Sequence, residues 1–183
     1  MKTALIVGDL QRGITDHYDF AAAAVPRVAD LLPRARAAGV LVVFIRTAFR
    51  VNRADLPDDD PLFAGFFDAG DSFHEGSAGT EPALPVHEED VVVVKRRASA
   101  FAGTDLDVVL RARGIGAVVV TGVATSAMVA ATCYDAADRG YRVAVLSDGC
   151  GDVDPEVHDL LVRKVFPGRG FTIGTCANWS PRA

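Results

Sequence analysis

The sequence has little cysteine and no extended basic run, and each shortage excludes a class of protein. Only three of its 183 residues are cysteine, an odd number without metal-binding spacing: Cys133, Cys150 and Cys176. We therefore expect reduced thiols in a cytoplasmic protein rather than a disulfide framework. Basic residues do not gather beyond the triplet at 95–97, and the net charge is −5, which argues against nucleic acid as a partner.

Signals for membranes, metals and nucleotide cofactors are missing as well. No apolar run approaches membrane-spanning length, and the first nine residues turn acidic too soon for a signal peptide. Glycine-rich phosphate loops of the dinucleotide or Walker type are absent from the sequence. His17, His74 and His87 lack the close pairing typical of metal ligands, so we interpret them as surface histidines. We expect neither a metal nor a cofactor, and no membrane partner.

Strand and helix patterns alternate along the chain. Half of the residues are apolar, which is enough for the core of one domain spanning residues 1–183. Apolar runs predict strands at 2–7, 40–45, 91–94, 117–121, 141–146 and 171–175. Helices are predicted at 21–38 and 105–113, from the turn after Gly122 to Gly140, and at 155–166. This alternation predicts an α/β three-layer sandwich, with helices on both faces of a mainly parallel sheet.

Prolines and capping residues indicate where the helices begin and end. Pro26 suits a first helical turn and favours a start near Val25, while Pro33 predicts a kink. Thr104 is expected to cap the helix at 105–113. Asp154 followed by Pro155 has the form of a helix start, so it opens the predicted helix at 155–166.

Residues 50–86 show no clear period. They carry four phenylalanines: Phe63, Phe66, Phe67 and Phe73. These rings are expected to pack on the domain or on a partner subunit, because exposure to water is unfavourable for apolar surface. Such a long aperiodic segment is typical of a lid, a binding loop or an oligomer contact, and the sequence leaves these open.

Candidate catalytic residues or a sharp turn follow three of the predicted strands. Asp9 and Gln11 follow the first strand, Lys95 follows the third, and a sharp turn at 121–125 follows the fourth. The carboxyl ends of parallel strands share one edge, where α/β folds bind ligands. By position alone, Asp9 is a loop cap or a catalytic acid or base, and Lys95 is a surface lysine or a buried partner of Asp9. We interpret Arg96 and Arg97 as a solvent pair, and Thr125 or Ser126 as the cap of the next helix.

Four segments taken together resemble the isochorismatase-like hydrolase superfamily. They are Val7-Gly-Asp-Leu-Gln, the stretch at 94–106, Thr121-Gly-Val-Ala-Thr and Asp135-Ala-Ala-Asp-Arg-Gly-Tyr. The resemblance covers nearly the whole chain and implies a six-stranded parallel sheet in the order 3-2-1-4-5-6. It also implies a cis peptide between Val123 and Ala124, an oxyanion hole of the Ala124 and Met128 amides, and a homodimer or homotetramer.

One position departs from the amidase members of that superfamily. The resemblance implies an Asp–Lys–Cys set in which Asp9 and Lys95 match, but Met128 occupies the place of the nucleophilic cysteine. A thioether has no proton to lose and forms no acyl intermediate. Cys133 lies five residues further, about 140° around a helix. Cys150 lies after the next strand, and the histidine pair of nicotinamidase metal sites is missing. Isochorismatases likewise lack the cysteine and use the aspartate as a general acid.

Two hypotheses of different classes follow. The first is a hydrolase of a small molecule without a covalent intermediate, with Asp9 as general acid or base and Lys95 tuning charge, while Met128 forms apolar wall. Its substrate contacts are expected from Gln11, Phe101, Val123, Ala124 and Thr125. The second is a catalytically silent family member that binds small molecules or serves assembly, with Met128 partly filling the pocket. Covalent hydrolysis through an unexpected residue is the remaining alternative.

Overall fold

A single six-stranded sheet organises the chain. The computed structural model describes residues 1–57 and 59–181. All strand pairs are parallel and their order is β3-β2-β1-β4-β5-β6. The strands are β1 (Lys2–Gly8), β2 (Leu41–Thr47), β3 (Val91–Lys95), β4 (Ile115–Val123), β5 (Arg142–Gly151) and β6 (Thr172–Gly174). The predicted fold class and strand order are confirmed.

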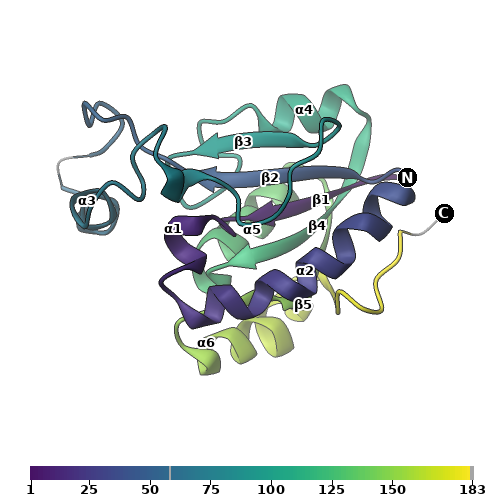
Figure 1. The fold of residues 1–183 in the computed structure, drawn as a ribbon. Helices are drawn as coiled ribbons and strands as arrows, with labels where there is room; N and C mark the ends of the chain where they lie inside the picture. The colour runs from purple at the N-terminus through teal and green to yellow at the C-terminus, as the bar shows by residue number, and fades with distance from the viewer. Residues whose placement is uncertain (58, 182–183) are drawn as a thin grey trace.

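Helices cover both faces of this sheet (Figure 1). They are α1 (Arg12–Thr15), α2 (Asp19–Ala37), α3 (Pro61–Asp68), α4 (Leu106–Ala112), α5 (Ala130–Asp138), α6 (Pro155–Leu160) and α7 (Phe166–Gly168). Two π-helical turns, η2 (Thr125–Val129) and η3 (Leu161–Val165), lead into α5 and α7, and η1 (Ala78–Thr80) is a 3₁₀ turn. Among the described residues, none of the helices combines the length and apolar character that a membrane crossing requires.

The central strand shows why the sheet is covered on both sides. Ala4 and Ile6 pack into one core cluster with residues of α4 and α5, whereas Leu5 and Val7 pack into a second cluster with α2. Successive side chains of a strand point to opposite faces, so a continuous apolar run supplies both cores. The valine-rich runs of the sequence therefore encode a buried parallel sheet.

The predicted start of the first long helix is wrong. Helix α2 begins at Asp19 rather than near Val25, and both Pro26 and Pro33 lie inside it. Each proline removes one backbone hydrogen bond from the helix. The apolar stripe that packs on the sheet already begins at Ala21. Its burial offsets the lost hydrogen bonds, and so tertiary packing overrides the local proline signal.

The segment 50–86 contains a helix that the sequence interpretation missed. Asp60 accepts hydrogen bonds from the amides of Leu62 and Phe63, and Pro61 is the first residue of α3. This is the Asp-Pro start that also opens α6 at Asp154. Leu56, Phe67 and Phe73 of this segment form a small separate core with Phe49, which directly precedes it. In Figure 1, α3 stands beyond the carboxyl ends of the strands.

Backbone contact between β1 and β4 leaves no room for a side chain at Gly122, which has φ +119°. A Cβ there would lie 1.9 Å from the carbonyl oxygen of Gly8. We expect Gly122→Ala to lower the free energy of unfolding by about 3 kcal/mol or more, through overpacking and backbone strain. Urea denaturation measures this loss.

Gly168→Ala is the matched control for this measurement. It changes a helical glycine whose Cβ would meet no described atom within 4 Å. The expected effect is neutral, or stabilising by up to about 1 kcal/mol. Equal stability of the Gly122→Ala and Gly168→Ala proteins would contradict the steric argument.

Candidate active site

Three polar side chains meet in a buried cluster at the carboxyl ends of β1, β2 and β3. Lys95 Nζ lies 2.8 Å from Asp9 Oδ2 and donates a hydrogen bond of 2.8 Å to Thr47 Oγ1. Thr47 Oγ1 in turn donates to Asp9 Oδ1 at 3.1 Å. Asp9, Thr47 and Lys95 are 6%, 4% and 3% exposed. The structure therefore brings the two predicted residues together, and it adds Thr47.

Asp9 carries both backbone strain and an unusual proton affinity. Its φ of +55° lies in the left-handed region, which is uncommon for residues other than glycine. Such conformations gather at functional sites. Burial raises the pKa of the Asp9 carboxyl, and this outweighs the lowering by Lys95 and by the hydrogen bond from Thr47. A carboxyl with a raised pKa can both hold and release a proton closer to neutral pH.

Gln11 lies behind this cluster rather than in front of it. Its amide accepts from the backbone N–H of Thr47 at 2.7 Å and donates to the carbonyls of Thr47 and Gly79. The side chain is buried, and it is not among the described residues that line the cavity beside Asp9. Gln11 therefore fixes the position of Thr47, which corrects the expectation of a substrate contact.

The turn after β4 is built around Ala124. The peptide bond between Val123 and Ala124 is cis. The carbonyl of Ala124 accepts from the amides of Ala127 and Val129, and Ala124 is the residue that precedes the π-helical turn η2. Neither Thr125 nor Ser126 caps this turn. The Thr125 hydroxyl instead donates to the Gly151 carbonyl and contacts His158 Nδ1 at 2.8 Å, away from the cavity.

Met128 sits on η2 with its thioether turned toward the sheet. It is 1% exposed, and its sulfur accepts a hydrogen bond of 3.4 Å from the hydroxyl of Thr132. A Cβ at Gly8 would lie 1.8 Å from the Met128 methyl carbon, so the side chain occupies the space that Gly8 leaves open. Met128 thus fills the floor beside Asp9 and presents no nucleophile.

The three cysteines are buried, and they lie outside the described lining of the cavity. Burial raises the pKa of Cys133 and of Cys176 to about 12, and the pKa of Cys150 well above its ordinary value. Cys150 belongs to β5, which runs beyond its predicted end. None of the three is therefore placed or ionised as a nucleophile would be.

We expect the native protein to resist thiol alkylation. With pKa values of about 12, roughly one thiol in ten thousand of Cys133 or Cys176 is ionised at pH 8. Iodoacetamide should leave the mass of the folded chain unchanged over an hour, whereas in urea it should add three groups. Intact mass spectrometry distinguishes these outcomes. Rapid labelling of one thiol with loss of turnover would instead favour covalent hydrolysis.

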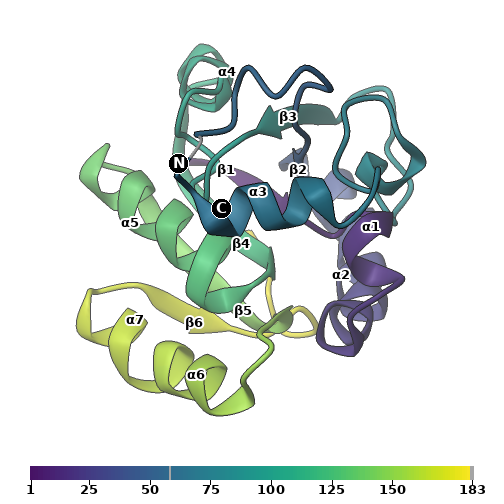
Figure 2. The same cartoon turned by 90° about the vertical axis from the view of Figure 1, so that its left-hand side faces the viewer.

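A cavity of about 320 Å³ opens from Asp9, Thr47 and Lys95. Val123, Ala124 and Met128 line its floor, and Asp152 stands at its side. Apolar residues from three further segments form the walls: Ile14, Tyr18, Phe20, Leu62, Phe63 and Phe66. In Figure 2 the carboxyl ends of the strands face the viewer and α3 crosses in front of them. Part of the aperiodic segment is therefore a wall of this site.

Phe101 does not line this cavity. Its ring lies in the core, stacked on Tyr141 with centroids 5.9 Å apart and under the guanidinium of Arg139. Ser99 donates to Asp135 and accepts from the amide of Phe101, so this turn is tied to α5. The tie directs Phe101 inward, which corrects its prediction as a pocket wall.

Sequence interpretation missed two polar residues of the site. Thr47 lies beyond the predicted end of the second strand, and a longer strand there would have placed it beside Lys95, its partner in the register. Asp152 follows β5, and its carboxylate accepts from the amide of Ser126 at 2.7 Å. Its acidic position after a strand was a usable signal. No local sequence pattern indicates that Phe63 and Phe66 line the cavity, because only tertiary packing brings α3 to this site.

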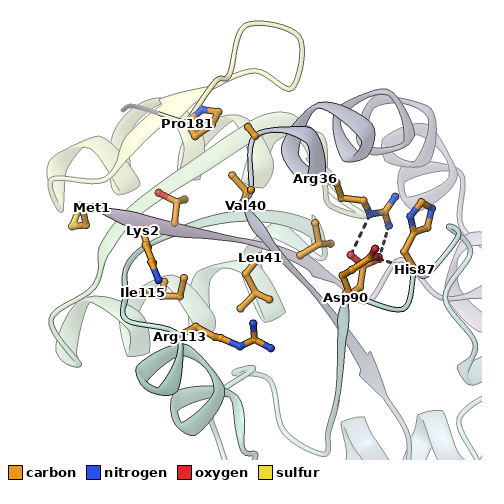
Figure 3. A pocket seen from close by; sticks show the side chains of 15 residues that line it. Met1, Lys2, Arg36, Val40, Leu41, His87, Asp90, Arg113, Ile115 and Pro181 are labelled. Carbon is orange, nitrogen blue, oxygen red and sulfur yellow. Dashed lines mark hydrogen bonds and ion pairs between the residues drawn. The ribbon is translucent and has the colours of Figure 1, made fainter.

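A larger hollow of about 580 Å³ lies at the opposite edge of the sheet, near Lys2, Leu41 and Ile115 (Figure 3). Its Arg36 and Asp90 form an ion pair with each other. This edge holds the amino ends of the strands, whereas α/β sheets bind ligands at the carboxyl ends. Among the described residues, no group of three or more His, Cys, Asp or Glu could hold a metal ion. The site at Asp9 is therefore the candidate.

Fold and site together define the class of this protein. It is a three-layer α/β protein with a buried acid–lysine pair where its central strands end, beside a non-proline cis peptide. The chain belongs to the isochorismatase family: the model of the isochorismatase domain matches residues 3–176. The resemblance drawn from the sequence is thereby confirmed.

Three relatives, one of them uncharacterized, are similar to this chain over most of its length. An uncharacterized isochorismatase family protein of Bacillus subtilis, YwoC, is 33% identical and the match covers 92% of this chain and 88% of YwoC. A maleamate amidohydrolase of Pseudomonas putida is 30% identical, over 86% and 76% of the two chains. A "probable inactive nicotinamidase" of Arabidopsis thaliana is 31% identical, over 98% and 95%.

Solved structures give the same family. The crystal structure of a cysteine hydrolase from Pseudomonas syringae pv. phaseolicola superposes with a TM-score of 0.87 at 27% identity, covering 96% of this chain and 89% of that one. The N-carbamoylsarcosine amidase of Thermoplasma acidophilum superposes with a TM-score of 0.80 at 28% identity, covering 99% of this chain and 100% of that one. Homologues with stated activities are hydrolases, so the family is one of hydrolytic enzymes.

Proposed function

We propose that this chain hydrolyses a small molecule without a covalent cysteine intermediate and that Asp9 is its general acid and base. The observation that carries the proposal is the buried pair of Asp9 and Lys95, 2.8 Å apart, which opens into a cavity whose nucleophile position holds Met128. This arrangement supports a mechanism in which a carboxyl group transfers protons and no thiol attacks the substrate.

The reaction follows from these groups. For an amide or ester, Asp9 takes a proton from water while the water oxygen attacks the carbonyl carbon. It returns that proton to the leaving nitrogen or oxygen as the bond breaks. For an enol ether, Asp9 gives its proton to the vinyl carbon, and water adds to the resulting cation while returning a proton to Asp9. The hemiketal so formed then breaks its C–O bond, which releases a carbonyl compound and an alcohol. Burial supports both roles, since it raises the pKa of Asp9.

Lys95 and the turn after β4 complete the machinery. Lys95 compensates the charge of Asp9 and is held by Thr47, so its ammonium is fixed before the substrate binds. The amide of Ala124 precedes η2 and the amide of Met128 lies within its first turn. Backbone N–H groups at the beginning of a helix lack partners in a preceding turn and favour negative charge. We assign these two amides to hydrogen bonds with the substrate oxygen that becomes negatively charged during the reaction. Val123 lies on the floor of the cavity beside them.

A product screen tests the proposal. The protein is incubated with isochorismate, other enol ethers, nicotinamide, N-carbamoyl amines and aromatic amides, and products are followed by liquid chromatography and mass spectrometry. We expect turnover of at least one compound with no covalent adduct on the protein during the reaction. An accumulating acyl-enzyme would overturn the non-covalent mechanism.

The second candidate function is that of a catalytically silent family member, which binds a small molecule or serves assembly without hydrolysing a substrate. The observation that favours it is the Met128 side chain, which fills the nucleophile position at 1% exposure. The similarity to a relative described as inactive points the same way. Binding of a screened compound without any product would support this function.

The assembly of this chain into a homodimer or homotetramer stays a prediction. Light scattering, which measures the molar mass in solution, would test it.

A further inference from the structure

We propose that this site selects substrates whose non-reacting part is neutral and apolar, and that it rejects carboxylates. The inference rests on the proposed function, because it concerns the substrate of the same cavity. It starts from the charges of the lining. Among the described residues that line the cavity, the charged side chains are Asp9, Asp152 and Lys95. Two are acidic and one is basic.

Lys95 is not available to hold a remote carboxylate. Lys95 is 3% exposed, and its ammonium is bound between Asp9 Oδ2 and Thr47 Oγ1, each at 2.8 Å. An ammonium has three N–H donors. The third can reach only one atom of a ligand, and that atom lies beside Asp9, at the reacting end. A second anionic group of the substrate would find Lys95 already used.

The two arginines after Lys95 are also held elsewhere. Arg96 is bound to the carboxylates of Asp55 and Glu75. Arg97 donates to the backbone carbonyls of Asp55 and Arg96. Both are half-buried, which corrects their interpretation as a solvent pair. The basic triplet at 95–97 thus leaves the cavity without a free cation from this segment.

Asp152 adds negative charge at the side of the cavity. It is 7% exposed, and one of its carboxylate oxygens accepts from the amide of Ser126 at 2.7 Å, at the start of η2. A substrate carboxylate would be placed near a second carboxylate in a mostly apolar space. Burying an unpaired charge there is strongly unfavourable.

The walls offer apolar contacts instead. Tyr18 and Phe20 lie with ring centroids 5.6 Å apart, and Phe66 and Phe73 lie 5.2 Å apart. All four line the cavity, as do the exposed Leu62 and Val153. Aromatic walls bind flat or branched apolar groups through burial and stacking. The substrate is therefore expected to carry its reactive group on a ring or a branched hydrocarbon.

Two primary amides that differ in the remote group test the selectivity: 3-phenylpropanamide and succinamate. Isothermal titration calorimetry on the full-length chain measures binding whether or not turnover occurs. We expect the phenyl amide to bind at least about tenfold more tightly at low salt. Equal or tighter binding of succinamate, or binding of neither amide, would overturn the proposal.

A second experiment on the same selectivity adds a positive charge at the cavity. Val153 is 76% exposed, so Val153→Arg is expected to fold normally. We expect this variant to tighten succinamate binding about tenfold, and the gain should shrink in 0.5 M salt. Val153→Gln is the neutral control, which separates added length from added charge. An equal gain in both variants contradicts the charge argument.

Selectivity and catalysis can fail separately in these experiments. If the phenyl amide binds preferentially and no compound is turned over, the selectivity stands and the proposed hydrolysis fails. If compounds are hydrolysed and those bearing carboxylates are preferred, the hydrolysis stands and the selectivity fails.

Discussion

Asp9→Asn should reduce turnover of any substrate found in the screen by at least about a thousandfold. The amide keeps the size of the carboxyl but cannot carry the proton that the reaction transfers. The fold should persist, because Lys95 keeps its hydrogen bond to Thr47 and the amide oxygen can still accept from that hydroxyl. Steady-state rates with matched circular dichroism spectra measure the effect.

The pH dependence identifies which role of Asp9 limits the rate. Because the pKa of Asp9 is raised, the limb of the pH profile of kcat/KM that reports Asp9 should lie at higher pH than for an ordinary carboxyl group. As a base, Asp9 must be ionised, so activity falls as pH drops through this pKa. As an acid, it must be protonated, so activity falls as pH rises through it.

Thr47→Val is the matched control for Asp9. It removes a hydrogen bond that lowers the pKa of Asp9, so the limb should move to higher pH while turnover survives. An unchanged limb would separate Thr47 from the titration. Full activity in Asp9→Asn would sink the assignment of Asp9 itself.

Met128→Cys should create a reactive thiol in a protein that otherwise has none. Position 128 lines the cavity with Asp9 and Lys95 and lies in η2, the first turn of the helical segment that continues into α5. A nearby cation and a helix start lower a thiol pKa, whereas the native cysteines have theirs raised. We expect iodoacetamide to label this variant at least about a hundredfold faster than the native chain at pH 7.5.

Peptide mapping must place this label on residue 128. Met128→Ala is the control, since it opens the same space without a thiol. Truncating a buried methionine costs about 2 kcal/mol or more, so folding of both variants is checked first. Failure of the folded Met128→Cys protein to label would show that the site cannot activate a nucleophile. New iodoacetamide-sensitive amide hydrolysis would show that only the thiol had been missing.

The sequence anticipated the two residues whose position depends only on where strands end. Asp9 and Lys95 follow apolar runs, and parallel strands align their carboxyl ends, so the fold class alone predicts that they share an edge. It could not predict their contact, because that depends on the stagger of β1, β2 and β3 and on Thr47, which bridges them. Nor could it predict the net direction of the Asp9 pKa, which depends on the balance of burial and pairing.

The sequence by itself determined the alternation of strands and helices, the parallel sheet and the methionine at position 128. These follow from residue type and periodicity, which act locally along the chain. Tertiary structure alone decided which way Gln11, Phe101 and Thr125 face. It also brought α3 over the strand ends, where its Leu62, Phe63 and Phe66 form an apolar wall of the cavity. Side-chain direction and packing between distant segments depend on contacts that no local pattern records.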